Sequence, residues 1–210
     1  MTKPLIWGAA TAPLVFLAER NPNRKPLIGV TLSPYQAAQA TAYLADRAEI
    51  RIGSYLDPDM FRRLPGKSLF FAIESFAHAE NAQVFITNLT AQAKPGDSFC
   101  LGDDLLEHPP ATRREAALLQ AFRAGWKVPD LQSRQDLIGI FGRHGWRLGL
   151  DEDWSPWLKP PGFWQRLGSL AAIGLPDNPP WIANLKGGAA LVLGHRCGLF
   201  HYRFMSWTKL

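Results

Sequence analysis

The stretch Pro4-Leu5-Ile6-Trp7-Gly8-Ala9-Ala10-Thr11-Ala12 decides the fold class of this chain. Its apolar start is typical of a β-strand, Gly8 opens a turn, and residues 13–20 follow as a helix-like segment. A second β-like run, Leu27-Ile28-Gly29-Val30, then ends in Thr31-Leu32-Ser33-Pro34. Strand, helix and strand in this order predict a βαβ unit. The first turn of such a unit is where main chain can approach a nucleotide-type cofactor.

Strand and helix signals alternate regularly over the first hundred residues. The strand candidates are 4–8, 27–31, 48–53, 68–74 and 98–103, and the helix candidates are 12–20, 34–46, 57–63 and 80–93. Ser33 is an N-cap candidate for helix 34–46, and Pro34 occupies its first helical position. This alternation, with apolar strands, predicts an α/β fold with a doubly wound, mostly parallel sheet.

The pattern changes after Pro109-Pro110. Helices are expected at 112–124, 133–144 and 181–197, and strands at 146–150 and 200–207. The Trp- and Pro-rich segment 151–180 lacks clean periodicity and is interpreted as a cap over a substrate. We therefore expect a single domain over 1–210, made of a cofactor-binding half (1–108), a helical and cap region (109–180), and a C-terminal helix and strand (181–210).

Composition excludes several classes of protein. The chain has 210 residues, 47% of them hydrophobic, which is typical of one globular domain. Its net charge of +5 comes from scattered basic residues, so we expect no nucleic-acid partner. No apolar run reaches the roughly 18 residues of a membrane span, and no secretory leader is evident, so a cytoplasmic protein is expected. The histidines lack ligand spacing with cysteines or acids, which disfavours a metal site.

Four segments, in order, resemble a known family. One segment, Gly29-Val30-Thr31-Leu32-Ser33-Pro34, is similar to the second strand of that family and the turn after it. Another, Phe71-Ala72-Ile73-Glu74-Ser75-Phe76-Ala77-His78, is similar to its fourth strand and the turn after it. Lys94-Pro95-Gly96 precedes a strand ending in Asp103-Asp104, and residues 198–204 are similar to a C-terminal portion. Together they resemble class I S-adenosylmethionine-dependent methyltransferases, nearest to the small-molecule branch that acts on tocopherols, sterols and natural-product sugars.

The resemblance implies a Rossmann-like sheet of seven strands with an antiparallel last strand, and S-adenosylmethionine as cofactor. It implies that the cofactor contacts eight residues: Gly8, Ala10, Thr31, Leu32, Ser33, Gly53, Ser54 and Glu74. It also implies catalytic roles for His78 as a general base, for Asp103 as an acidic partner, and for Glu74 at the substrate side. The alternatives without a functional role are an ordinary surface histidine at position 78 and a purely structural helix cap by Ser33.

The chain departs from the family pattern at the cofactor. At the end of the first strand, Ile6 stands where the family has an acidic residue. The three glycine positions of the turn that follows are occupied by Gly8, Ala10 and Ala12. The added methyl groups crowd main chain that should approach the cofactor. Ser54 replaces an acidic residue that would accept a hydrogen bond from adenine. The N-terminal helical extension usual in relatives also has no counterpart before the first strand.

These features leave three hypotheses for the function. The first is an active methyltransferase whose small, largely apolar substrate lies under the Trp-rich cap. The second is a catalytically silent subunit that supports or regulates an active methyltransferase-like chain in a homo- or hetero-oligomer. The third is the same fold adapted to another reaction, such as cyclisation. Gly187-Gly188 is interpreted as a site of close helix packing, because no phosphate-binding Lys-Ser/Thr follows.

Overall fold

The computed structural model describes residues 12–20, 27–60, 66–158 and 180–210. The predicted first strand 4–8, with Gly8 and Ala10, lies outside the described residues, as does most of the predicted cap. The described helices are α1 (Ala12–Arg20), α2 (Pro34–Leu44), α3 (Ala82–Gln92), α4 (Arg113–Trp126), α5 (Arg134–Arg143) and α7 (Pro180–Cys197). The described strands are β1 (Ile28–Thr31), β2 (Glu49–Ile52), β3 (Leu69–Ile73), β4 (Ser98–Leu106), β5 (Trp146–Asp153) and β6 (Phe200–Lys209).

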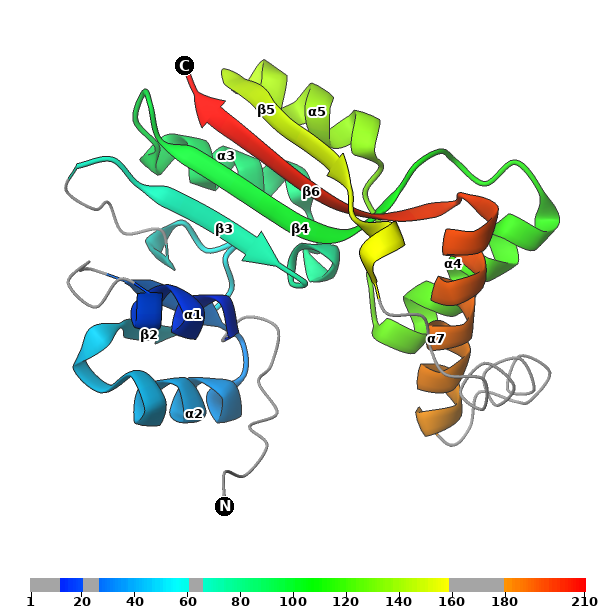
Figure 1. The fold of residues 1–210 in the computed structure, drawn as a ribbon, viewed down its shortest axis with the longest axis horizontal. Coiled ribbons are helices and arrows are strands. Elements are labelled where there is room, and N and C mark those ends of the chain that lie inside the picture. The colour runs from blue at the N-terminus through cyan, green and yellow to red at the C-terminus, as the bar shows by residue number, and fades with distance from the viewer. Residues whose placement is uncertain (1–11, 21–26, 61–65, 159–179) are drawn as a thin grey trace.

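Within the described ranges the strands form two sheets (Figure 1). The smaller sheet is the parallel pair β1-β2, and the larger has the order β3-β4-β6-β5. Strands β3, β4 and β5 run in one direction, and β6 runs against both of its neighbours, which confirms the antiparallel last strand. The expected count of seven strands is not reached in the described part of the chain, which contains six.

Side-chain caps fix where several helices begin. The hydroxyl of Ser33 accepts a hydrogen bond from the main-chain N–H of Gln36 at 3.3 Å, as expected for the N-cap of α2. Thr112 and Glu115 form a reciprocal capping box at the start of α4. The helix expected at 57–63 is a single 3-10 turn, Pro58–Met60, within the described residues.

Helices α3 and α5 cover one face of the larger sheet (Figure 1). The core beneath them is aromatic, because Phe99, Phe141 and Trp207 lie in stacked or tilted contact with ring centroids 4.2–5.9 Å apart. Each of these side chains is at most 1% exposed. Burial of such large rings is the main favourable term that holds the sheet against its helices.

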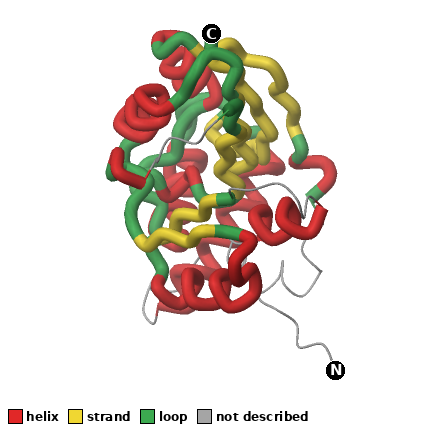
Figure 2. The backbone as a smooth tube through the Cα atoms, turned by 90° about the vertical axis from the view of Figure 1, so that its left-hand side faces the viewer, coloured by secondary structure: helices red, strands yellow, loops and turns green. Residues whose placement is uncertain are grey.

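Helices α4 and α7 form a separate pair beyond the carboxyl ends of β3 and β4 (Figure 1). Figure 2 shows the same backbone turned by 90° about the vertical axis. The pair crosses closely at two glycines. A Cβ atom added at Gly187 would lie 2.9 Å from the Cα of Gly125, whereas one at Gly188 would meet nothing within 4 Å. The expectation of close helix packing is therefore confirmed for Gly187.

Candidate functional site

The carboxyl end of β3 carries a strained residue. Glu74 follows the strand with a φ of 47°, in the left-handed region that residues other than glycine rarely adopt. Its N–H donates to the carbonyl of Gly102 at 2.7 Å, which holds this conformation against β4. Strain of this kind persists only where the surroundings impose it, and it is concentrated at binding sites. Glu74 is exposed at the edge where open α/β sheets bind ligands.

A phenol from β6 reaches the same edge. The hydroxyl of Tyr202 donates to Oε1 of Glu74 at 3.4 Å. Gly102 packs beneath it: a Cβ there would lie 3.6 Å from the Tyr202 hydroxyl, an ordinary contact, and 3.0 Å from Ile73 Cδ1, a tight one. Burial and the neighbouring carboxylates, Glu74 first among them, raise the pKa of Tyr202 strongly. The hydroxyl therefore keeps its proton and acts as a donor.

Asp103 lies beneath the turn that follows Glu74. Its carboxylate is 5% exposed and accepts hydrogen bonds from the N–H groups of Phe76 at 2.7 Å, Ala77 at 2.9 Å and Asp104 at 3.0 Å. Burial raises the pKa of Asp103 to about 7, and the hydrogen bonds from Ala77 and its neighbours oppose that rise. In this position the side chain holds the 3-10 turn 76–78 and does not face solvent.

The same turn presents His78, whose side chain is exposed. No hydrogen bond or ion pair to His78 occurs among the described residues, so nothing there orients its ring. The turn is also held by Tyr55, whose hydroxyl donates to the carbonyl of Ser75 at 3.2 Å. Burial, followed by the charge of Asp103, raises the pKa of Tyr55 to about 12, so this donor is permanent. Glu74 and His78 thus lie on one short segment after β3, and the carboxylate of Asp103 on β4 binds the main chain of that segment.

The predicted adenosine contacts lie at the carboxyl edge of the β1-β2 sheet. The hydroxyl of Thr31 donates to Oε1 of Gln36 at 2.9 Å, and that of Ser33 caps α2. The hydroxyl of Ser54 accepts from the N–H of Leu56 at 3.1 Å. All three oxygens are therefore engaged in local structure, so the capping interpretation of Ser33 is confirmed.

Two apolar side chains stand uncovered at this edge. Leu32 is 71% exposed and Ile52 is 57% exposed. Gly53 follows Ile52, and the side chain of Met60 packs over it, because a Cβ there would lie 2.6 Å from the Met60 sulfur. Exposed aliphatic groups suit the flat faces of a purine ring, and the free lone pairs of the neighbouring hydroxyls can still accept hydrogen bonds. The described residues therefore fit the adenosine end of S-adenosylmethionine, although without a carboxylate at positions 31–33 or 53–54.

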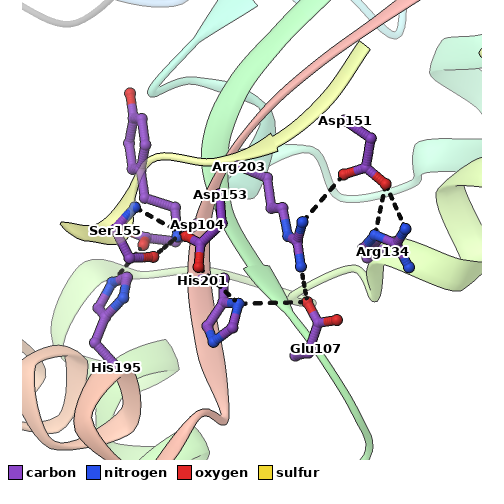
Figure 3. A network of polar contacts seen from close by, with 10 residues as sticks. Asp104, Glu107, Arg134, Asp151, Asp153, Ser155, His195, His201 and Arg203 are labelled. Carbon is purple, nitrogen blue, oxygen red and sulfur yellow. Dashed lines mark hydrogen bonds and ion pairs between the residues drawn. The ribbon is translucent and has the colours of Figure 1, made fainter. Parts of the chain in front are cut away.

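A second polar cluster lies where β4 and β5 end and β6 begins, near the start of α5 (Figure 3). Asp151 binds both Arg134 and Arg203, and Arg203 donates to Glu107 at 2.7 Å. The ring of His201 lies 3.6 Å from Glu107 and 3.4 Å from Asp153. The alternating charges tie the three strands to α5 in a half-buried network, which we interpret as structural.

Among the described residues no group of three or more histidine, cysteine or acidic side chains could hold a metal ion. The helices described by the structure include none that is long and apolar enough to cross a bilayer.

Comparison with known proteins identifies the fold. The sequence matches no protein-family profile and no curated protein. Solved structures do match. A geranyl diphosphate methyltransferase in complex with S-adenosylmethionine superposes with a TM-score of 0.69 at 14% identity, covering 96% of this chain and 75% of its own. The geranyl diphosphate C-methyltransferase from Streptomyces coelicolor A3(2) gives 0.65 at 16% identity, covering 96% and 68%.

An O-methyltransferase from a polyketide synthase multienzyme of Brevibacillus brevis, bound to S-adenosylhomocysteine, gives a TM-score of 0.68 at 17% identity. That match covers 96% of this chain and 64% of the multienzyme's domain. The chain has the fold of S-adenosylmethionine-dependent methyltransferases. Identities this low establish the fold and not the reaction, so the function has to be argued from the site.

Proposed function

We propose that this chain transfers a methyl group from S-adenosylmethionine to a small, largely apolar molecule. The observation that carries the proposal is the strained Glu74 at the carboxyl end of β3, with the Tyr202 hydroxyl bound to it. This pair lies at the sheet edge where the fold binds its ligands. A bound S-adenosylmethionine would supply a positively charged sulfonium whose methyl group is open to displacement.

Each described residue of the site has a defined task in this proposal. The Glu74 carboxylate attracts positive charge, and the permanent donor on Tyr202 fixes its orientation. Asp103 positions the turn that carries His78 next to the substrate. Leu32 and Ile52 bind the faces of the purine. Helices α4 and α7, beyond the carboxyl ends of β3 and β4, lie on the side of the site where the apolar substrate would bind.

Calorimetric titration with S-adenosylmethionine and S-adenosylhomocysteine tests the proposal. We expect micromolar binding to the wild-type chain. In Glu74→Gln the binding should be weakened about tenfold or more, because the ligand loses a hydrogen bond to the charged carboxylate, and such a bond contributes roughly 1.5–3 kcal/mol. Glu80→Gln removes an exposed carboxylate six positions along the chain and is the matched control. No binding at millimolar ligand would refute the proposal.

A second candidate is a catalytically silent subunit that supports an active methyltransferase-like chain. It is favoured by the edge of β1-β2, where the hydroxyls of Thr31, Ser33 and Ser54 are engaged locally and Ser54 stands where an acidic residue is expected. A chain that fails to bind either ligand alone, but binds a methyltransferase and changes its activity, would support this candidate. Sedimentation of the purified chain with and without that partner measures the complex.

A further inference from the structure

A stack of aromatic rings begins on the strand that carries Tyr202. Phe204 lies two positions further along β6, so its ring is on the same face of the sheet as that of Tyr202. The indole of Trp154 stacks on Phe204, with ring centroids 4.5 Å apart and an angle of 9° between the ring planes. The indole of Trp157 lies parallel to that of Trp154, at 6.2 Å and 10°. The three ring planes therefore share nearly one orientation.

The turn that carries the two indoles is fixed to the candidate site. It is the 3-10 turn Ser155–Trp157, which follows β5 (Figure 1). The N–H of Trp154 donates to the carbonyl of Tyr202, and the N–H of Tyr202 donates to the hydroxyl of Ser155, each at 2.8 Å. The indole N–H of Trp154 donates to Glu152 at 2.9 Å, which fixes the direction of its ring. Tyr202, whose hydroxyl lies in the candidate site, thus anchors the aromatic turn through its main chain.

The outer ring of the stack is open to solvent. Trp157 is 80% exposed, more than any other large apolar side chain of the described residues. Trp154 and Phe204 are half-buried, so the open surface of the stack belongs mainly to Trp157. An indole gains much by burial, and exposed apolar surface next to a binding site is typical of a surface that a ligand covers.

A flat and rigid surface of this kind favours a flat ligand. Aromatic rings prefer offset parallel contact with centroids roughly 4.5–7 Å apart, and such contacts contribute to binding beyond the area they bury. A puckered aliphatic ring contacts an indole with only some of its atoms. Because Phe204 and Trp154 already hold the stack parallel, a planar ligand meets an ordered surface and the cost of ordering it on binding is small.

We propose that the indole of Trp157 binds a planar aromatic ring of the methyl acceptor. The inference rests on the proposed function and specifies its substrate class as aromatic. The bound ring is the part of the acceptor remote from its reacting atom, because Trp154 and Phe204 separate Trp157 from Tyr202 and the site at Glu74. Trp157 is therefore a specificity residue, which takes no part in making or breaking bonds.

Two bicyclic alcohols that share one carbon skeleton test the proposal. 2-Naphthol is planar, whereas decahydro-2-naphthol is its saturated and puckered counterpart. In calorimetric titration of the full chain with S-adenosylhomocysteine present, 2-naphthol should bind about fivefold or more tightly than the saturated alcohol. In Trp157→Leu, which keeps an apolar side chain but no aromatic face, the affinity for 2-naphthol should fall to that of the saturated alcohol. Equal affinities of the two alcohols for the wild-type chain would overturn the inference.

Trp181→Leu is the matched control. It removes another exposed indole, which lies on α7 and belongs to no ring of the stack. This variant should bind both alcohols as the wild type does. An equal loss of 2-naphthol affinity in Trp181→Leu and Trp157→Leu would remove the assignment to Trp157, because binding would then depend on exposed indoles in general.

A second copy of the chain is the other possible cover for Trp157, and sedimentation velocity distinguishes it from an acceptor. A dimer of the wild-type chain that Trp157→Leu dissociates, with no preference for 2-naphthol, would overturn the inference. The inference and the proposed function also fail separately. Unchanged 2-naphthol affinity in Trp157→Leu, with normal binding of S-adenosylhomocysteine, would remove only Trp157 from the substrate site. Absence of S-adenosylhomocysteine binding in the wild-type chain would remove the proposed function.

Discussion

Replacement of Asp103 by asparagine should change how stability depends on pH. The carboxylate is buried and its pKa is raised to about 7, against an ordinary value of about 3.9 in an unfolded chain. The folded state therefore holds this proton more tightly than the unfolded state does. The stabilisation is complete below about pH 3.9 and is lost as the pH rises to about 7.

The magnitude follows from the difference of about three pKa units. At 1.36 kcal/mol per unit, ionisation of Asp103 costs the fold up to ~4 kcal/mol above pH 7, and the slope between about pH 4.5 and 6.5 is ~1.4 kcal/mol per unit. The Asp103→Asn variant has no such slope. The carbonyl of its new amide can accept from Phe76 and Ala77, while the NH2 group opposes the Asp104 N–H at a pH-independent cost of ~1–3 kcal/mol.

Urea denaturation of both proteins at half-unit steps from about pH 4.5 to 8 measures the effect. The free energy of unfolding of Asp103→Asn minus that of the wild type should rise by ~1.4 kcal/mol per pH unit up to about pH 6.5 and then level off. Asp59→Asn, at an exposed position, controls for the loss of one negative charge. Parallel curves for wild type and Asp103→Asn would refute the assignment of a raised pKa to Asp103.

Three further substitutions test the packing, a cap and the cofactor edge. Gly187→Ala should destabilise the fold by ~1–3 kcal/mol, because its Cβ would press on Gly125. Gly188→Ala should be neutral or stabilise by up to ~1 kcal/mol, because alanine has the higher helix propensity. Thermal unfolding that ranked the two variants in the reverse order would contradict the close crossing of α4 and α7. Thr112→Ala should cost ~1 kcal/mol in a chemical denaturation experiment, through loss of the capping box, and an unchanged midpoint would count against that cap. Leu32→Ala should leave stability within ~0.5 kcal/mol but weaken S-adenosylhomocysteine binding several-fold in calorimetry, and unaltered affinity would remove this residue from the cofactor site.

Sequence reasoning predicted the described strands and helices well, because apolar runs, N-caps and Pro-Gly stops are local signals. Strand 98–103 was expected to end at an acidic pair, and it extends to Leu106 because β6 pairs with it along its whole length. That pairing depends on residues about a hundred positions away, so no local pattern contains it.

The candidate site was predicted only in part, for the same reason. Glu74 and His78 follow a strand, and the end of a strand can be found from the sequence. The inward direction of Asp103, and the arrival of Tyr202 and Trp154 at the same edge, depend on the register of β4 with β6 and on the main-chain hydrogen bond from Trp154 to Tyr202. Alternation along 200–207 does place residue 202 on one face, but only the register shows which residues it meets. The roles of Gly8 and Ala10 stay predictions.

The place of β6 between β4 and β5 also sets an order for folding during synthesis. β4 and β5 do not pair with each other, since each bonds to β6. The main chain of Lys209 exchanges hydrogen bonds with Gly96 and Asp97, and the N–H of Leu210 donates to Gly145. A nascent chain that ends after β5 therefore has an unpaired edge on β4, no described strand to pair with β5, and an aromatic core that lacks Trp207. Such a chain exposes aggregation-prone surface, so the interval before residues 200–210 emerge is when this protein most needs a chaperone.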